Sequence, residues 1–230
     1  MATYVLIPGA DGRAWYWHLV AAELRTRGHQ AVPVDLPYGR SDGLEEHVDA
    51  VLAAMVSAPL TPHPLVLVAQ SLAGFVAPLV CARVPVDALV LVNAMVPAPG
   101  ESAGEWWEAT GQPAARAALA AREGRDPDAP FDLRTDFFHD VPEELTAQAL
   151  AAGPAGPPEA IFIQHWPLTG WPPVPTRFIQ GREDRFFPLD FQRRLVAERL
   201  GITVEEAPGG HLLALSRPRE LADLLAGPPA

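Results

Sequence analysis

Short apolar runs alternate with amphipathic helical stretches over roughly the first 95 residues of the chain. The runs that predict buried strands lie at residues 3–7, 30–34, 65–69 and 88–92. Between them, apolar positions recur with helical spacing at about residues 15–27, 44–57 and 72–83. Regular alternation of strands and helices predicts a parallel sheet joined by right-handed crossovers.

The alternation stops at residues 97–172, where Pro, Gly and Ala are abundant and no strand-like run occurs. Short helices are predicted there near residues 104–110, 113–123, 142–152 and 158–165. Asp140 precedes the third as a candidate N-cap, with Glu143 three positions on. The pattern leaves open whether this insert moves as a lid or packs rigidly; in either case it should roof a pocket.

Strand and helix patterns resume after the insert. Strand-like runs at 174–179 and 202–206 enclose a helical stretch at 189–200, and a closing helix follows. The prediction is therefore an α/β fold with a mostly parallel sheet of about six strands and helices on both faces. Its core comprises residues 1–96 and 173–230, and the helical insert comprises 97–172.

Ser71 directly follows the apolar run at 65–69 and precedes a helical pattern. Ala69, Ala73 and Gly74 around it are small, as the tight strand-to-helix turn of a nucleophile elbow requires. The alternative is an ordinary serine at a helix N-terminus.

An acyl-transfer serine needs a histidine to take its proton and an acid to orient that histidine. Asp184 lies in a polar loop after the strand-like run at 174–179, and His211 follows Gly209-Gly210 after the last run. The order Ser, Asp, His is that of sheet-based hydrolases. Glu183 is a rival for the acid, and Asp35 is a further alternative at the end of an earlier strand.

Four segments together carry a resemblance to a known family. They are residues 4–10 with the aromatic start at 15–17, the Asp35-Leu36-Pro37-Tyr38-Gly39-Arg40-Ser41 loop, the Ser71 turn, and the Gly-Arg-Glu-Asp and Gly-Gly-His loops. In this order they resemble the α/β-hydrolase superfamily, in the small branch of plant methylesterases and hydroxynitrile lyases. Pro8 departs from the usual His, and Ala69 and Ala73 replace glycines of the elbow.

The resemblance implies a serine carboxylic-ester hydrolase with Ser71, His211 and Asp184 as its triad. It also implies that the backbone N–H groups of Ala10 and Leu72 form an oxyanion hole. Lyases of the branch use a Thr and a Lys near the nucleophile, but the matching positions here hold Gly9 and the Lys-free segment 185–187. A ligand-binding or sensing protein with slow turnover is an alternative that an intact triad leaves open.

Aromatic residues are frequent in the insert, which favours a small, largely apolar ester as the substrate. They are Trp106, Trp107, Phe131, Phe137, Phe138, Phe162, Trp166 and Trp171. From the insert we expect four residues to contact substrate: Trp106, Phe138, His139 and His165.

The net charge of −11 argues against nucleic acid and anionic membranes as partners. No apolar run approaches the ~18 residues of a membrane span, and the N-terminus lacks the basic region of a signal peptide. Cys81 is the single cysteine, so we expect no internal disulfide, and the cytoplasm is the expected location.

Neither a metal nor another cofactor is expected, because H-E-x-x-H, paired Cys/His spacings and a full dinucleotide fingerprint are absent from the sequence. Apolar residues of the insert leave association into a homodimer open.

Overall fold

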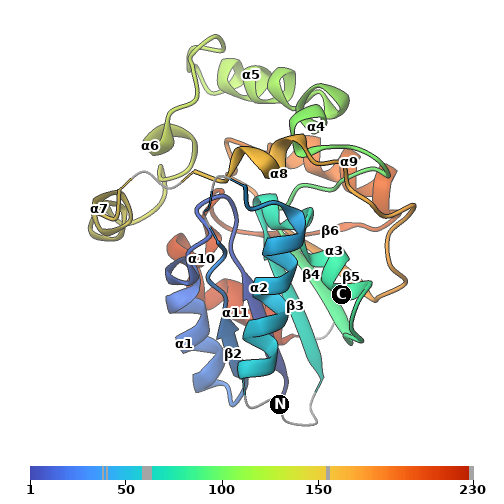
Figure 1. Ribbon diagram of the computed structural model, residues 1–230. Helices are drawn as coiled ribbons and strands as arrows, with labels where there is room; N and C mark the ends of the chain where they lie inside the picture. Colours follow the sequence, from blue (N-terminus) through green and yellow to red (C-terminus); the bar gives the residue numbers. More distant parts are fainter. Residues whose placement is uncertain (38, 40, 59–63, 154–155, 228–230) are drawn as a thin grey trace.

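The computed structural model describes residues 1–37, 39, 41–58, 64–153 and 156–227. Within these ranges six parallel strands form one sheet in the order β2-β1-β3-β4-β5-β6 (Figure 1). The strands are β1 (Thr3–Ile7), β2 (Gln30–Pro33), β3 (Leu65–Gln70), β4 (Ala88–Val92), β5 (Thr176–Gly181) and β6 (Val204–Ala207). The predicted α/β fold is confirmed. Tyr38 and Arg40, in the loop that resembles the family's, lie outside the described residues.

Helices cover both faces of the sheet because successive strand residues point to opposite sides. Val5 of β1 belongs to a buried cluster with Val48, and Leu6 to a second cluster with Leu24. The first face carries α2 (Leu44–Ser57), α3 (Ala77–Cys81) and α9 (Leu189–Leu200). The second carries η1 (Ala14–Trp17), α1 (His18–Thr26), α10 (Leu213–Ser216) and α11 (Pro218–Ala226).

The helix after Ser71 is shorter than predicted. A 3₁₀ turn, η2 (Ser71–Gly74), comes first, and α3 begins only at Ala77. Pro78 lies in the first turn of α3, and because proline has no N–H it cannot continue a helical hydrogen-bond ladder from the preceding turn. The predicted continuous helix over 72–83 is therefore wrong.

Five short helices make up the described part of the insert and lie over the end of the sheet that carries Ser71 (Figure 1). They are α4 (Ala103–Thr110), α5 (Gln112–Arg122), α6 (Leu133–Asp136), α7 (Glu143–Ala151) and α8 (Glu159–Ile163). Asp140 does not cap α7 as predicted, because Pro142 occupies the N-cap position. Its carboxylate instead accepts a hydrogen bond from the Gly210 amide at 2.7 Å.

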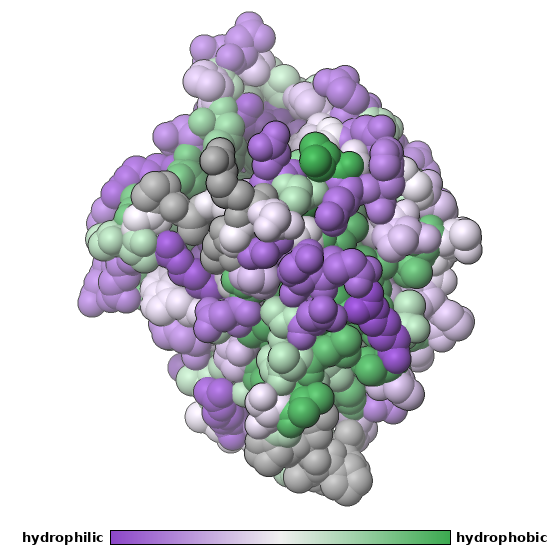
Figure 2. Space-filling model, viewed as in Figure 1, coloured by the Kyte–Doolittle hydropathy of each residue, from purple (hydrophilic) through white to green (hydrophobic). Residues whose placement is uncertain are grey.

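Hydrophilic residues cover most of the face shown in Figure 2, and hydrophobic residues gather in its lower half. Val56 at the end of α2 and Ile163 at the end of α8 are among the exposed large hydrophobic residues. No helix in the described ranges has both the length and the apolar character that crossing a membrane requires.

Candidate active site

The sheet topology brings the loop after β1 beside the turn after β3. The strand order reverses at β1, whose neighbours are β2 and β3, and ligands of parallel sheets bind at such a switch point. Ile7 pairs with Ala69, so Ala10 and Ser71 both leave the sheet at this edge. The two backbones approach closely, since a Cβ on Gly9 would lie 2.9 Å from the Cβ of Ser71.

Ser71 is held in the strained backbone conformation of a nucleophile elbow. Its φ of +52° lies in the left-handed region, which costs a residue with a side chain about 1–3 kcal/mol. The close packing of the turn explains the small residues around it, since a Cβ on Gly74 would collide with the Met95 carbonyl oxygen. The result is that Ser71 Oγ lies 3.1 Å from His211 Nε2.

Asp184 completes a hydrogen-bonded chain, with its Oδ2 2.9 Å from His211 Nδ1. Its Oδ1 accepts from the Phe186 and Phe187 amides at 2.8 and 2.9 Å, and Gln180 Nε2 donates to Oδ2 at 3.1 Å. All three residues of this hydrogen-bonded chain are buried, with exposed fractions of 7% for Ser71, 1% for Asp184 and 0% for His211. The structure thus brings together the three residues that the sequence pattern singled out.

The two rival acids lie elsewhere. The Glu183 carboxylate accepts a hydrogen bond from the Gly209 amide. Asp35 Oδ1 accepts from the Ala14 amide at 2.7 Å and lies on the surface. Both carboxylates hold loop backbone, and Asp184 is the acid that contacts His211.

Asn93 was missed by the sequence analysis and fixes the loop that carries His211. Its side-chain NH₂ donates to the carbonyls of Gly210 and His211 at 3.0 and 2.9 Å. Its Oδ1 accepts from the Gly181 amide at 2.7 Å. Like Ser71 it has a positive φ, +45°. The available signal was a lone asparagine, the only one in the chain, directly after the apolar run that forms β4.

Three phenylalanine rings surround the His211 imidazole. Phe137 of the insert stacks on it with a centroid distance of 4.5 Å and an interplanar angle of 19°. Phe186 and Phe187 contact it edge-on at 5.3 and 5.2 Å. Because these rings keep water away, electrostatic interactions at the imidazole are stronger than they would be in solvent.

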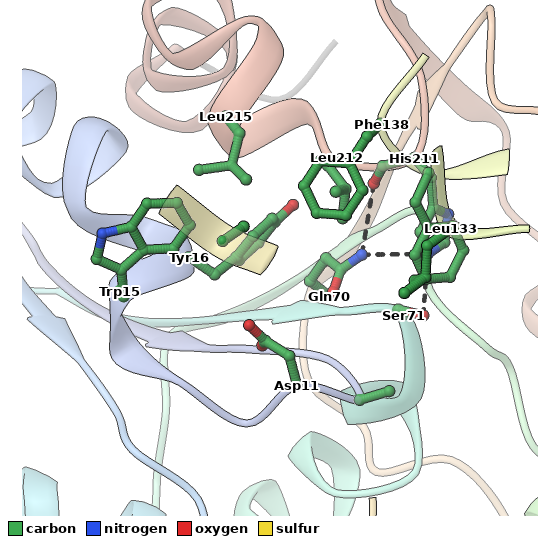
Figure 3. A pocket seen from close by; sticks show the side chains of 13 residues that line it. Asp11, Trp15, Tyr16, Gln70, Ser71, Leu133, Phe138, His211, Leu212 and Leu215 are labelled. Atoms are coloured by element: carbon green, nitrogen blue, oxygen red, sulfur yellow. Dashed lines mark hydrogen bonds between the residues drawn. The ribbon is translucent and has the colours of Figure 1, made fainter. Parts of the chain in front are cut away.

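A pocket of about 120 Å³ opens beside Ser71 and His211 (Figure 3). Most of its lining is apolar or aromatic, and Asp11 and Gln70 supply polar groups. A second compartment of about 300 Å³ shares Asp11, Leu133, Phe138 and Ala149 with it, so the two adjoin. The apolar and aromatic residues of the first are Ala10, Trp15, Tyr16, Leu133, Phe137, Phe138, Ala149, Leu212 and Leu215.

Among the residues expected to contact substrate, Phe138 lines the pocket, as does Ala10, the expected oxyanion donor. Leu72, the other expected donor, directly follows Ser71 in the first turn of η2, where helical N–H groups have no partner within the helix.

The other three expected substrate contacts do not line it. Trp106 is fully buried and donates to the Val96 carbonyl, because its helix turns this face toward the core. His139 hydrogen-bonds the Glu183 carbonyl and faces a separate polar depression. His165 is exposed, with Nδ1 2.8 Å from the Gly100 carbonyl oxygen.

Metal ligands and the Cys81 thiol are the remaining candidates for chemistry in the described part of the chain. No three His, Cys, Asp or Glu side chains there gather in a way that could hold a metal ion. Burial raises the pKa of the Cys81 thiol to about 12, which leaves it protonated at neutral pH.

Comparison with known proteins identifies a hydrolase family and relatives that are named esterases. A family model described as "Alpha/beta hydrolase family" matches residues 4–224. Probable esterase PIR7A from Oryza sativa subsp. indica is 29% identical over 257 residues, covering 96% of this chain and 94% of the relative. Esterase PIR7B from Oryza sativa subsp. japonica is 27% identical over 250 residues, with 96% and 93% covered.

Solved structures share the fold. A polyneuridine aldehyde esterase superposes with a TM-score of 0.77 at 21% identity, covering 98% of both chains. An extracellular alpha/beta-hydrolase from a Paenibacillus species superposes with a TM-score of 0.75 at 20% identity, again over 98% of both chains.

Proposed function

Because this chain belongs to the alpha/beta hydrolase family, we propose that it is a serine hydrolase that cleaves carboxylic esters through an acyl-enzyme. The observation that carries the proposal is the buried chain from Ser71 to His211 to Asp184, with contacts of 3.1 and 2.9 Å, at the wall of a mostly apolar pocket. The names of the rice relatives, both esterases, point the same way.

In the proposed reaction Ser71 Oγ attacks the ester carbonyl while His211 Nε2 takes its proton. His211 then donates that proton to the departing alkoxide, which leaves as the alcohol, and the acyl group stays bonded to Ser71 Oγ as an ester. Water attacks this ester, His211 takes a proton from the water and returns it to Ser71 Oγ, and the carboxylic acid departs. Asp184 holds the imidazole tautomer and stabilises the imidazolium.

The negative charge on the carbonyl oxygen would be stabilised by the backbone N–H groups of Ala10 and Leu72. Each donor of this kind is worth roughly 10²–10³ in rate. Both are backbone groups at the sheet edge where the loop after β1 meets the turn after β3, so their positions depend on the strand pairing and not on side-chain identity.

We propose small, largely apolar esters as the substrate class. The inner compartment of about 120 Å³ is below the roughly 300–1,000 Å³ of pockets for drug-sized ligands.

On sequence grounds we also propose a cytoplasmic location, since a single cysteine rules out an internal disulfide. Self-association into a homodimer is testable by light scattering.

Hydroxynitrile-lyase chemistry is a second candidate that the site disfavours. The position of the lyases' Thr is Gly9, where a Cβ would already press on Ser71 Cβ at 2.9 Å. The segment 185–187 after the triad acid contains no Lys, and its one cation, Arg185, donates to the Thr135 carbonyl and pairs with Glu123. A ligand-sensing role with slow turnover remains distinguishable by experiment.

The proposal is tested by incubating the protein with a fluorophosphonate and measuring intact mass, followed by peptide mapping. We expect one stoichiometric adduct on Ser71 that is absent from Ser71→Ala and retained by Ser57→Ala, a control at an exposed serine of α2. A panel of short-chain esters should then be hydrolysed by the wild type and by Ser57→Ala. A folded wild-type protein that forms no adduct and turns over no ester would overturn the proposal in favour of the sensing role.

A further inference from the structure

The mostly apolar pocket contains one carboxylate that the proposed reaction does not use. Asp11 directly follows Ala10 and lines both the inner compartment with Ser71 and the outer compartment. Figure 3 shows its side chain directed into the pocket, toward the side of Tyr16 and Gln70. Asp11 therefore stands at the junction that a bound ester would pass.

No cation of the protein pairs with this carboxylate among the ion pairs of the described residues. Asp11 Oδ1 accepts a hydrogen bond from the Arg13 amide at 3.3 Å. The Arg13 guanidinium, however, donates to the carbonyls of Ala152 and Gly153 at 3.0 and 3.4 Å, next to the end of α7. Burial raises the pKa of Asp11, and the amide and the positive charge of Arg13 offset only part of that rise.

Partial burial of a carboxylate that has no direct ion pair costs stability. Groups with pKa values shifted in this way concentrate in functional clefts. This cost would be offset if a bound ligand placed a positive charge in direct contact with the Asp11 carboxylate.

Aromatic residues lie on the same side of the pocket. Figure 3 places Trp15 at one end of the pocket and Ser71 with His211 at the other, with Tyr16 and Asp11 between them. The Tyr16 hydroxyl accepts from the Ala214 amide at 3.4 Å, and burial raises its pKa, so it stays a neutral phenol. Aromatic ring faces attract organic cations, and quaternary ammonium groups in particular.

We propose that Asp11 is a specificity-determining residue that selects esters carrying an amine or quaternary ammonium group. The cationic group lies toward Asp11 and Trp15, while the ester carbonyl reaches Ser71. Esters with an anionic group are disfavoured by the same carboxylate. This inference rests on the proposed esterase function and adds a cationic group to the small ester proposed as its substrate.

The test uses ester pairs that differ by one charged atom. Acetylcholine and 3,3-dimethylbutyl acetate have the same shape, with nitrogen in one and carbon in the other. Glycine methyl ester and methyl propanoate place the charge on the acyl side instead. For each pair, the ratio of kcat/KM values for the cationic and neutral ester is measured in the wild type and in Asp11→Asn. Comparing the two proteins cancels the intrinsic reactivity of the esters.

We expect the ratio to fall about tenfold in Asp11→Asn for at least one pair, as the loss of a partly screened attraction between two opposite charges implies. The isosteric Asn retains an oxygen for the Arg13 amide. Glu144→Gln, which removes an exposed carboxylate of α7 outside the pocket, should leave the ratio unchanged. Asp11→Leu should lower the ratio at least as far as Asp11→Asn, and circular dichroism checks that each variant folds.

Equal ratios in the wild type and in Asp11→Asn for both pairs would overturn the inference while leaving the esterase function intact. Failure of the esterase function itself appears differently, as no adduct on Ser71 and no turnover of any ester. In that case tetramethylammonium binding, followed by calorimetry, still decides the inference. Binding to the wild type that is lost in Asp11→Asn supports a cation site, and absence of binding to both proteins overturns it.

Discussion

Replacing Asn93 by Ala should loosen the loop that carries His211. The substitution removes one oxygen and one nitrogen that together make three hydrogen bonds of 2.7–3.0 Å. Their partners are the Gly181 N–H and the carbonyls of Gly210 and His211, in three buried residues. Alanine cannot replace any of these bonds, so the partners are left unpaired unless the backbone moves or water enters.

The expected loss of stability follows from these contacts. The loss of each hydrogen bond lowers the free energy of unfolding by about 0.5–1.5 kcal/mol, and by more when its buried partner is left unpaired. Alanine also lacks asparagine's tolerance of the left-handed conformation at φ +45°, which adds about 1 kcal/mol. We therefore expect Asn93→Ala to lower the free energy of unfolding by about 3–5 kcal/mol, a large part of the 5–15 kcal/mol typical of a domain.

Urea denaturation and esterase kinetics measure the two consequences. Because His211 would lose its alignment with Ser71, kcat should fall about 10²-fold. Asn93→Gly should recover about 1 kcal/mol relative to Ala, since glycine accepts the positive φ, but should not restore kcat. Gln148→Ala, on the exposed face of α7, controls for truncating an amide. A loss below 1 kcal/mol with unchanged kcat would refute the role assigned to Asn93.

Four other substitutions or treatments probe the site and its surroundings. Asp184→Asn should lower kcat by about 10⁴-fold because the wrong imidazole tautomer then faces Ser71; a loss below tenfold would contradict this. Phe137→Leu should lower kcat two- to fivefold, since a stacked ring stabilises the imidazolium by about 0.5–1 kcal/mol; unchanged kcat would argue against that role. Asp11→Asn should raise the melting temperature at pH 7, because the raised pKa of Asp11 means that its ionised form costs stability, and the gain should vanish at pH 3, where the carboxyl is protonated. Cys81 should resist iodoacetamide at pH 8 until the protein is unfolded; rapid labelling of the native protein would contradict the burial that raises its pKa to about 12.

The sheet and the Ser–His–Asp chain could be predicted because each depends on a strong local pattern. Apolar runs give β1 and β4 at their observed bounds, and the periodic stretches give α2 and α9. Parallel strands place all their carboxyl ends at one edge, so residues that follow three separate strands converge there. Ser71, Asp184 and His211 follow β3, β5 and β6 in this way.

The pocket could not be predicted to the same extent, because side-chain direction in the insert depends on tertiary packing. Trp106 and Phe138 are equally apolar in sequence, yet one is buried in the core and the other lines the pocket. The four-residue α6 is too short to show a helical period. Asp140 has the sequence context of a helix cap, but the Gly210 amide binds its carboxylate instead.

The contacts made by residues 137–140 restrict the route by which an ester reaches Ser71. Phe137 stacks on His211, His139 binds the Glu183 carbonyl, and Asp140 binds Gly210. Moving this segment away from the sheet would break all three contacts and remove the ring that shields the imidazole, so entry by that route would disassemble the site. The outer compartment, bounded by Arg13 and α7, adjoins the inner one, and passage from one to the other leaves these three contacts intact. Because Asp11 stands where the two compartments join, an ester that enters there meets its carboxylate before it meets Ser71.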